Sequence, residues 1–212
     1  MSRGRFITFE GGEGAGKSTQ VRRLAARLHG RGLEVVATRE PGGSPGAEMI
    51  RHLLVNGEAE RWSPVTETLL MYAARRDHIE RVIAPALARG AWVVCDRFAD
   101  STRAYQGAAG GTAAELIAAL EAHVLEDVRP DLTLVFDLAT AQGLARAADR
   151  GGAEARFESK GEAFHGRLRQ AFLEIAAREP LRCAVIDGAA AINAVEAAVW
   201  AVVEQRLAPP NG

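Results

Sequence analysis

The chain has 212 residues and a formal net charge of −1 at pH 7, and this length predicts one domain whose core needs no disulfide or metal for stability. Hydrophobic residues make up 48% and charged residues 25% of the chain, which is typical of a folded globular protein and argues against disorder. The near balance of 26 basic and 27 acidic residues excludes nucleic-acid binding through bulk positive charge, although it allows a local basic site.

Short apolar runs alternate along the chain with longer helical patterns, which predicts an α/β fold with a parallel sheet covered by helices. We expect five strands, at Arg5–Glu10, Glu34–Thr38, Trp92–Asp96, Leu132–Asp137 and Cys183–Asp187. The third and fourth runs are almost continuously apolar, as expected of strands that are buried on both faces of a sheet.

Helix signals fill the gaps between these runs. The expected helices, in chain order, are Lys17–Arg31, a long helix from Ser63-Pro64 through Tyr72 towards Ala88, a helix after the capping box Thr112-Ala113-Ala114-Glu115, and Ala194–Leu207. Pro85 is expected to bend or break the second of these helices. The stretch from Arg146 to Gly161 lacks apolar periodicity, so it predicts either a solvated loop or a mobile lid.

The apolar segments and the cysteines indicate the cellular compartment of the protein. No apolar stretch approaches the ~20 residues needed to span a bilayer, and the chain begins without a signal-peptide pattern. Cys95 and Cys183 are expected to be buried, reduced thiols, with a structural disulfide as the alternative. We therefore predict a cytoplasmic protein with no membrane partner.

The strongest motif is a glycine-rich loop that fits G-x-x-x-x-G-K-[ST] between the first strand and the first helix. Its glycines allow backbone N–H groups to face one cavity, and the helix N-terminus adds positive potential for phosphate. Lys17, one of only two lysines in the chain, is predicted to reach the β- and γ-phosphates of ATP, and Ser18 to bind Mg²⁺. The predicted ATP site comprises Gly11, Gly12, Glu13, Gly14, Ala15, Gly16, Lys17, Ser18 and Thr19.

A P-loop alone leaves ATPase, GTPase and kinase activities open. Asp96 and Arg97 follow the third strand, at the edge of the sheet where ligands bind in such folds. The Asp96 carboxylate could therefore join the coordination shell of Mg²⁺, and the Arg97 guanidinium could bind a second phosphate group. The alternative is that the two side chains form only a surface ion pair. Arg146, Arg150 and Arg156 indicate either a solvated charged face or lid arginines that stabilise the transferring phosphoryl group. The five histidines show no metal-ligand spacing and are expected on helix surfaces.

Taken together, the motifs resemble bacterial thymidylate kinases from Phe6 to Leu207. The matching segments are the P-loop with Phe9-Glu10 before it, Thr38-Arg39-Glu40-Pro41-Gly42-Gly43, Tyr72-Ala73-Ala74-Arg75, Asp96-Arg97-Phe98, Asp100-Ser101-Thr102-Arg103-Ala104-Tyr105-Gln106-Gly107, Arg129-Pro130-Asp131-Leu132-Thr133 and Phe136-Asp137. The resemblance implies a single P-loop kinase domain over residues 1–212, a three-layer sandwich with a five-stranded parallel sheet and a lid at about 146–161. It also implies transfer of the ATP γ-phosphate to dTMP with Mg²⁺, by a homodimer.

The family pattern assigns roles to individual positions. By resemblance, the catalytic residues are Lys17, Arg97, Arg146, Arg150 and Arg156, and Mg²⁺ would be held by Ser18, Glu10 and Asp96. The dTMP site would comprise Glu10, Arg39, Pro41, Met71, Arg75, Arg97, Ser101, Thr102, Tyr105 and Gln106, with a cis bond between Glu40 and Pro41. At the position of Met71, relatives usually have a Phe that stacks on thymine, and at the position of Phe98 they usually have a Tyr or His.

Two rival functions stay open at this point. The first is another pyrimidine nucleoside monophosphate kinase or a deoxynucleoside kinase. The second is an ATP-dependent switch that binds nucleotide without acceptor-stimulated turnover.

Overall fold

The computed structural model describes residues 3–58, 60–150, 155–158 and 160–209. They contain a five-stranded sheet in the order β2-β3-β1-β4-β5, in which every neighbouring pair is parallel. The strands are β1 (Phe6–Gly11), β2 (Val35–Arg39), β3 (Trp92–Asp96), β4 (Leu132–Asp137) and β5 (Cys183–Asp187). The predicted α/β fold and all five predicted strands are confirmed, each within one residue.

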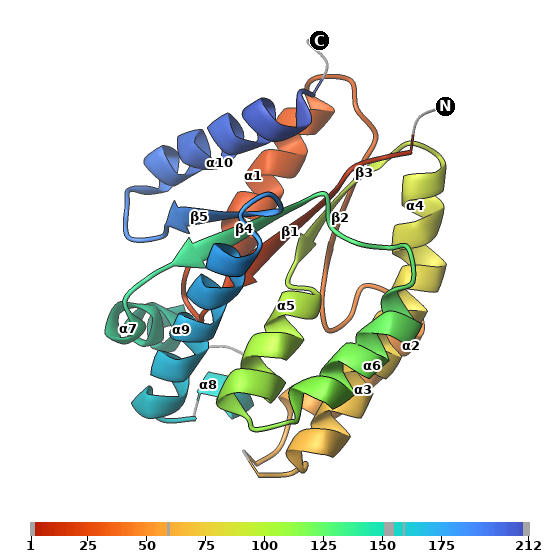
Figure 1. The fold of residues 1–212 in the computed structure, drawn as a ribbon. Helices are drawn as coiled ribbons and strands as arrows, with labels where there is room; N and C mark the ends of the chain where they lie inside the picture. Colours follow the sequence, from red (N-terminus) through yellow and green to blue (C-terminus); the bar gives the residue numbers. More distant parts are fainter. Residues whose placement is uncertain (1–2, 59, 151–154, 159, 210–212) are drawn as a thin grey trace.

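Helices cover both faces of this sheet (Figure 1). They are α1 (Lys17–His29), α2 (Pro45–Val55), α3 (Pro64–His78), α4 (Ala84–Ala88), α5 (Ala99–Thr102), α6 (Ala114–Leu125), α7 (Thr140–Arg150), α8 (Ala155–Glu158), α9 (Glu162–Arg178) and α10 (Ile192–Leu207), with π-helical segments η1 (Ile79–Ile83) and η2 (Arg103–Ala109). Alternate strand residues enter different cores: Ile7 and Phe9 pack with α1 and α10, whereas Phe6 packs with η1 and α4 on the opposite face. The molecule is therefore a three-layer sandwich.

Local sequence signals explain where the second predicted helix begins and changes. The Ser63 hydroxyl accepts a hydrogen bond from the Thr66 N–H at 3.2 Å, and Pro64 follows as the first helical residue, so the predicted N-cap is confirmed. The predicted break takes the form of η1, which separates α3 from α4 just before Pro85. A proline lacks the N–H that a regular helix needs, so a change of helical geometry next to it is expected.

Another predicted cap is wrong. The helix after Thr112 has no side-chain cap and begins at Ala114. The Thr112 hydroxyl instead lies 3.0 Å from the buried Thr68 hydroxyl of α3, so a tertiary contact replaces the local one. Cys95 and Cys183 are buried free thiols, as predicted. Within the described ranges, no helix is long and apolar enough to cross a membrane.

Candidate active site

The glycine-rich loop links β1 to α1 at the carboxyl edge of the sheet. Gly14 has φ +65°, and a Cβ there would lie 2.1 Å from the carbonyl oxygen of Gly143 in α7, so only glycine fits. The Lys17 Nζ donates to the Gly12 carbonyl at 2.6 Å, which holds the ammonium over the loop. Burial lowers the pKa of Lys17 to about 8, with Arg97 lowering it further and Glu13 opposing.

Two oxygen donors meet beside this loop. The Ser18 hydroxyl donates a hydrogen bond to the carboxylate of Asp96, the last residue of β3. Register places Asp96 opposite Phe9 of β1 and Arg39 of β2, so this carboxylate lies at the centre of the carboxyl edge. A hydroxyl and a carboxylate side by side are the hard oxygen ligands that Mg²⁺ prefers, with phosphate oxygens and water completing its shell.

Arg97 connects the loop to a second pocket. Its backbone is left-handed, with φ 68°, an arrangement that costs a non-glycine residue about 1 kcal/mol or more and turns the side chain back over β1. Its guanidinium donates to the Gly11 carbonyl at 2.9 Å, to the Ser101 hydroxyl at 3.3 Å and to Glu13 at 3.0 Å. Tyr105 also donates to Glu13, at 2.6 Å. Burial alone would raise the pKa of Glu13, but Arg97 and Lys17 outweigh it and lower the pKa to about 2.

The second pocket gathers most of the predicted dTMP residues. Its lining is Glu13, Glu40, Pro41, Val55, Met71, Arg75, Arg97, Phe98, Ser101, Thr102, Tyr105, Gln106 and Phe157. All the predicted dTMP residues except Glu10 and Arg39 are among them. We refer to this cavity as the acceptor pocket.

Arg75 is the most buried cation of the acceptor pocket, with 2% exposure. It donates to Glu40 at 2.7 Å and to the Phe98 carbonyl and the Thr102 hydroxyl at 3.0 Å each, while Nη1 has no hydrogen-bond partner among the described residues. Its guanidinium carbon lies 4.9 Å from the centre of the Tyr72 ring and 5.2 Å from that of Phe98. The phenylalanine at position 98 therefore packs on a cation, and the free N–H of Arg75 is available to an anion.

The chain matches a protein-family model described as thymidylate kinase over residues 9–199. It belongs to the thymidylate kinase family. A curated thymidylate kinase from Caulobacter vibrioides is 70% identical, covering 98% of this chain and 99% of that protein. One from Bradyrhizobium sp. strain BTAi1 is 54% identical over 97% of this chain and 92% of that protein. The crystal structure of thymidylate kinase from Ehrlichia chaffeensis superimposes with a TM-score of 0.78 at 36% identity, covering 95% of this chain and 99% of that one.

Two residues that the family pattern suggests for dTMP lie outside the acceptor pocket. Glu10 is completely buried, and its carboxylate accepts from the Phe98 N–H at 2.8 Å and from the Ser101 hydroxyl at 2.5 Å. Burial raises the pKa of Glu10 to about 8, with Asp100 adding to the shift. Glu10 therefore supports the pocket through Ser101. Arg39 is 55% exposed and pairs with Glu48 at 3.1 Å.

The three predicted lid arginines do not form one cluster. Arg146 lies on α7 next to the glycine-rich loop and donates to the Gly188 carbonyl at 3.0 Å. Arg156 is buried on α8 and forms an ion pair with Glu67 of α3 at 2.5 Å. The side chain of Arg150 and residues 151–154 are outside the described part of the chain. The expectation of an irregular segment from residue 146 is wrong where α7 and α8 form.

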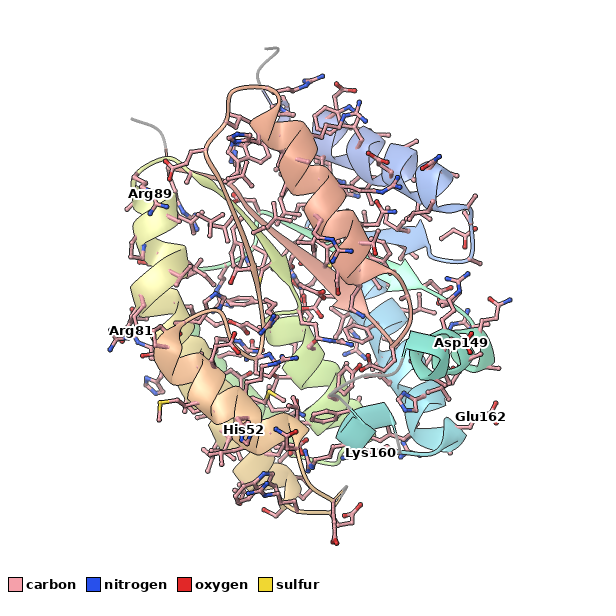
Figure 2. The ribbon with its side chains drawn as sticks, turned by 180° about the vertical axis from the view of Figure 1, so that it is seen from behind. His52, Arg81, Arg89, Asp149, Lys160 and Glu162 are labelled. Carbon is pink, nitrogen blue, oxygen red and sulfur yellow. The ribbon has the colours of Figure 1, made fainter. Side chains whose placement is uncertain are left out.

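Lys160, the second lysine, follows α8 (Figure 2). Its Nζ lies 5.7 Å from the centre of the Phe157 ring and 5.0 Å from that of Phe164. The ammonium therefore makes cation–π contacts with one ring at the end of α8 and one ring at the start of α9. Phe157 itself lines the acceptor pocket and packs edge-on against Tyr105, with ring centres 5.7 Å apart.

Two histidines that were expected on helix surfaces are buried, so that prediction is wrong for them. His78 is completely buried, with Nδ1 3.0 Å from Glu40 and Nε2 2.8 Å from the Thr38 hydroxyl, and it supports the carboxylate that pairs with Arg75. His165 has 4% exposure and lies on the inner face of α9. Sequence analysis placed Glu40 in a family-specific segment before a cis proline but gave its side chain no role, and it did not assign Glu67 or Phe157. Of these, only Glu40 carried a signal, its position in the Arg-Glu-Pro-Gly-Gly turn.

Proposed function

We propose that this chain is an ATP-dependent kinase that transfers the γ-phosphate of ATP to dTMP, giving dTDP and ADP. One observation carries the proposal: a P-loop and a separate pocket with a buried, partly unsatisfied guanidinium share Arg97 at their boundary. An enzyme that only hydrolyses ATP has no need of the second anion site. Membership of the thymidylate kinase family supports dTMP as the acceptor.

The chemical task is to bring two anionic phosphates together and offset their repulsion. The P-loop amides and Lys17 hold the donor phosphates, while Arg75 binds the acceptor phosphate through its free N–H. Arg97, fixed by Gly11 and Glu13, lies between them and offsets the charge at the point of transfer. We propose that Arg146, beside the loop, contributes to the same compensation, and Arg150 stays a prediction.

Mg²⁺ fits this site, because Ser18 and Asp96 present oxygen donors beside the loop. When bound, the ion neutralises phosphate charge and polarises the transferring group. We propose that Ser18 and Asp96 hold it, directly or through water. The raised pKa of Glu10 and its bonds to Phe98 and Ser101 support an indirect role for that residue.

The decisive experiment measures acceptor-dependent ADP release across dTMP, dUMP, UMP, dCMP and thymidine. We expect dTMP to give the highest kcat/KM. If another monophosphate or thymidine exceeds it, the assignment of the acceptor is wrong, and the enzyme is one of the rival kinases. Nucleotide binding without stimulation by any acceptor would instead favour the ATP-dependent switch.

We also propose that the protein is a homodimer. The outer faces of α2 and α3 expose apolar side chains at four-residue spacing, Met49 and Leu53 on α2 and Val65 and Leu69 on α3, with exposures from 39% to 75%. Exposed apolar side chains on two neighbouring helices suit an interface with a second copy of the chain. Sedimentation at micromolar concentration tests this proposal. A cytoplasmic location stays a prediction.

A further inference from the structure

We propose that Glu67 is a positioning residue that fixes the side-chain amide of Gln106, so that the acceptor pocket selects nucleotides whose base carries a ring N–H and rejects cytosine. The inference rests on the proposed function, because it concerns the base of the same acceptor. It arises from a buried network of three side chains on three different elements: Glu67 on α3, Gln106 on η2 and Arg156 on α8.

The first step concerns the orientation of the amide. Glu67 has 4% exposure and Gln106 has 1%, and the Gln106 Nε2 donates to the Glu67 Oε1 at 2.8 Å. The Glu67 Oε1 accepts this hydrogen bond, so the NH₂ group of the Gln106 amide faces Glu67. The opposite orientation would place two acceptor oxygens against each other in a buried site, at a cost of about 1–3 kcal/mol. Glu67 therefore determines which end of the Gln106 amide points away from it.

The second step concerns the cavity that the Gln106 amide oxygen faces. Gln106 separates two cavities: the acceptor pocket, and a neighbouring cavity next to Trp62 and Phe164. Both Glu67 and Gln106 line the neighbouring cavity, but only Gln106 lines the acceptor pocket. With its nitrogen held on the Glu67 side, the amide presents its oxygen as the hydrogen-bonding group for the acceptor pocket.

The third step explains how a carboxylate is kept in this buried place. Arg156 is itself 2% exposed, and its Nη1 lies 2.5 Å from the Glu67 Oε2. The same guanidinium donates to the carbonyls of Leu54 and Glu58, at 3.0 Å each, which anchors it at the end of α2. Arg156 occupies Oε2 and Gln106 donates to Oε1, so both oxygens of the Glu67 carboxylate face donors. Arg156 thus acts on the acceptor base through two other side chains.

The consequence for specificity follows from the edges of the pyrimidine bases. Thymine and uracil carry an N–H at ring position 3, which can donate to the Gln106 oxygen. Cytosine has an unprotonated nitrogen there, so its lone pair would face the amide oxygen and both groups would lose their hydrogen bonds on burial. A site built to accept a hydrogen bond rejects an analogue that lacks the donor far more strongly than an apolar pocket rejects a change of shape.

The test compares kcat/KM for dTMP, dUMP and dCMP in the wild-type enzyme and in Glu67→Gln. The glutamine at position 67 can either donate or accept, so Gln106 is free to turn. We expect the dTMP-to-dCMP ratio to fall about tenfold or more, since that corresponds to one lost or reversed buried hydrogen bond. The KM for the acceptor should change while the KM for ATP stays constant. The ratio is measured on one sample, so a reduced folded fraction cancels from it.

Glu121→Gln is the matched control. Glu121 is a glutamate of α6 with 5% exposure that accepts from Arg103 at 2.7 Å and from Tyr72 at 3.2 Å, and it does not line the acceptor pocket. Its substitution should lower the melting temperature without changing the ratio. If Glu67→Gln does not fold, Glu67→Gln combined with Arg156→Met leaves neither charge of that pair behind and should show the same fall in ratio.

The outcomes separate the two proposals. An unchanged ratio in the folded Glu67 variant, or an equal fall in the Glu121 control, would overturn the role of Glu67 and leave the kinase assignment intact. A wild-type enzyme that uses dCMP as well as dTMP would also overturn it. A wild-type enzyme without activity on dTMP would instead overturn the proposed function itself.

Discussion

Replacing Arg75 by methionine tests whether the buried guanidinium of the acceptor pocket serves the fold, the substrate or both. Arg75 pairs with Glu40 at 2.7 Å, and both side chains have at most 3% exposure. The substitution keeps much of the side-chain volume and causes two kinds of loss: the fold loses the charged partner of Glu40 and the donor to Phe98 and Thr102, and the substrate loses the unpaired Nη1. These two losses should appear in different measurements.

The structure gives both magnitudes. Removing one partner of a buried ion pair typically costs about 3–5 kcal/mol. Because Glu40 keeps His78 as a neighbour at 3.0 Å, we expect Arg75→Met to lower the free energy of unfolding by about 3 kcal/mol, the lower end of that range. The lost N–H would have made a hydrogen bond to a phosphate dianion. Bonds to charged groups are worth about 1.5–3 kcal/mol, so dTMP should bind about tenfold to a hundredfold more weakly.

A double-mutant cycle with Glu40→Gln separates the two effects. Urea unfolding should give a coupling energy of about 1–3 kcal/mol, because the double variant Arg75→Met/Glu40→Gln leaves no buried charge unpaired. Calorimetric titration with dTMP should show weak binding in both Arg75 variants. Arg103→Met is the control: it breaks ion pairs with Asp100 and Glu121 outside the acceptor pocket, so it should destabilise the fold and spare dTMP affinity.

Two results would refute this reasoning. If the double variant recovers dTMP affinity together with stability, Arg75 acts only through the fold. If Arg103→Met weakens dTMP binding as strongly as Arg75→Met, the free N–H of Arg75 is not what holds the phosphate.

Three further predictions concern the boundary between the two nucleotide sites. Arg97→Ala should leave ADP binding largely intact in calorimetry and lower kcat by about a hundredfold or more; normal turnover would exclude Arg97 from the reaction. The pKa of Glu13 is lowered from 4.5 to about 2, so its stabilisation is present above pH 4.5 and is lost as the pH falls towards 2. Urea unfolding should therefore show at most about 3 kcal/mol of acid sensitivity that is absent from Glu13→Gln; equal acid sensitivity in both proteins would contradict it. A Cβ at Gly143 would lie 2.5 Å from the Glu13 carbonyl oxygen, so Gly143→Ala should raise the KM for ATP about tenfold, within the usual 1–3 kcal/mol cost of overpacking, and leave the KM for dTMP unchanged. An unchanged KM for ATP would show that α7 can shift away from the glycine-rich loop and accommodate the added methyl group.

The sheet and the P-loop could be predicted because their signals are local. In the strand Trp92–Asp96 every residue before the final aspartate is apolar, and the glycine spacing of the loop is contained in eight consecutive residues, 11–18. Ser63 and Pro64 likewise specify a helix start with adjacent residues. In each case the physical cause lies within a few positions of its effect.

The buried ion pairs and hydrogen bonds around the acceptor pocket could not be predicted from local sequence signals. The partners Glu40 and Arg75 are 35 residues apart, and Arg156 and Leu54 are 102 apart. Burial makes these pairs necessary, but burial is a property of the packed helices and not of the sequence around Glu67 or His78. Thr112 shows the converse, because a residue with a good local signal is taken by a tertiary hydrogen bond to Thr68.

The arginines of the acceptor site also explain how a chain with net charge −1 can bind two small polyanions. Arg75, Arg97 and Arg156 each face a glutamate, at 2.7, 3.0 and 2.5 Å respectively. For Arg75 this pairing leaves donor capacity, because a guanidinium has five N–H groups and its Nη1 has no hydrogen-bond partner among the described residues. What the carboxylate contributes is a fixed direction: Glu40 holds Arg75 with Nη1 free, and Glu13 holds Arg97 against the loop. Donors that are already oriented need no reorganisation when a phosphate arrives, so local geometry decides anion binding here and bulk charge does not.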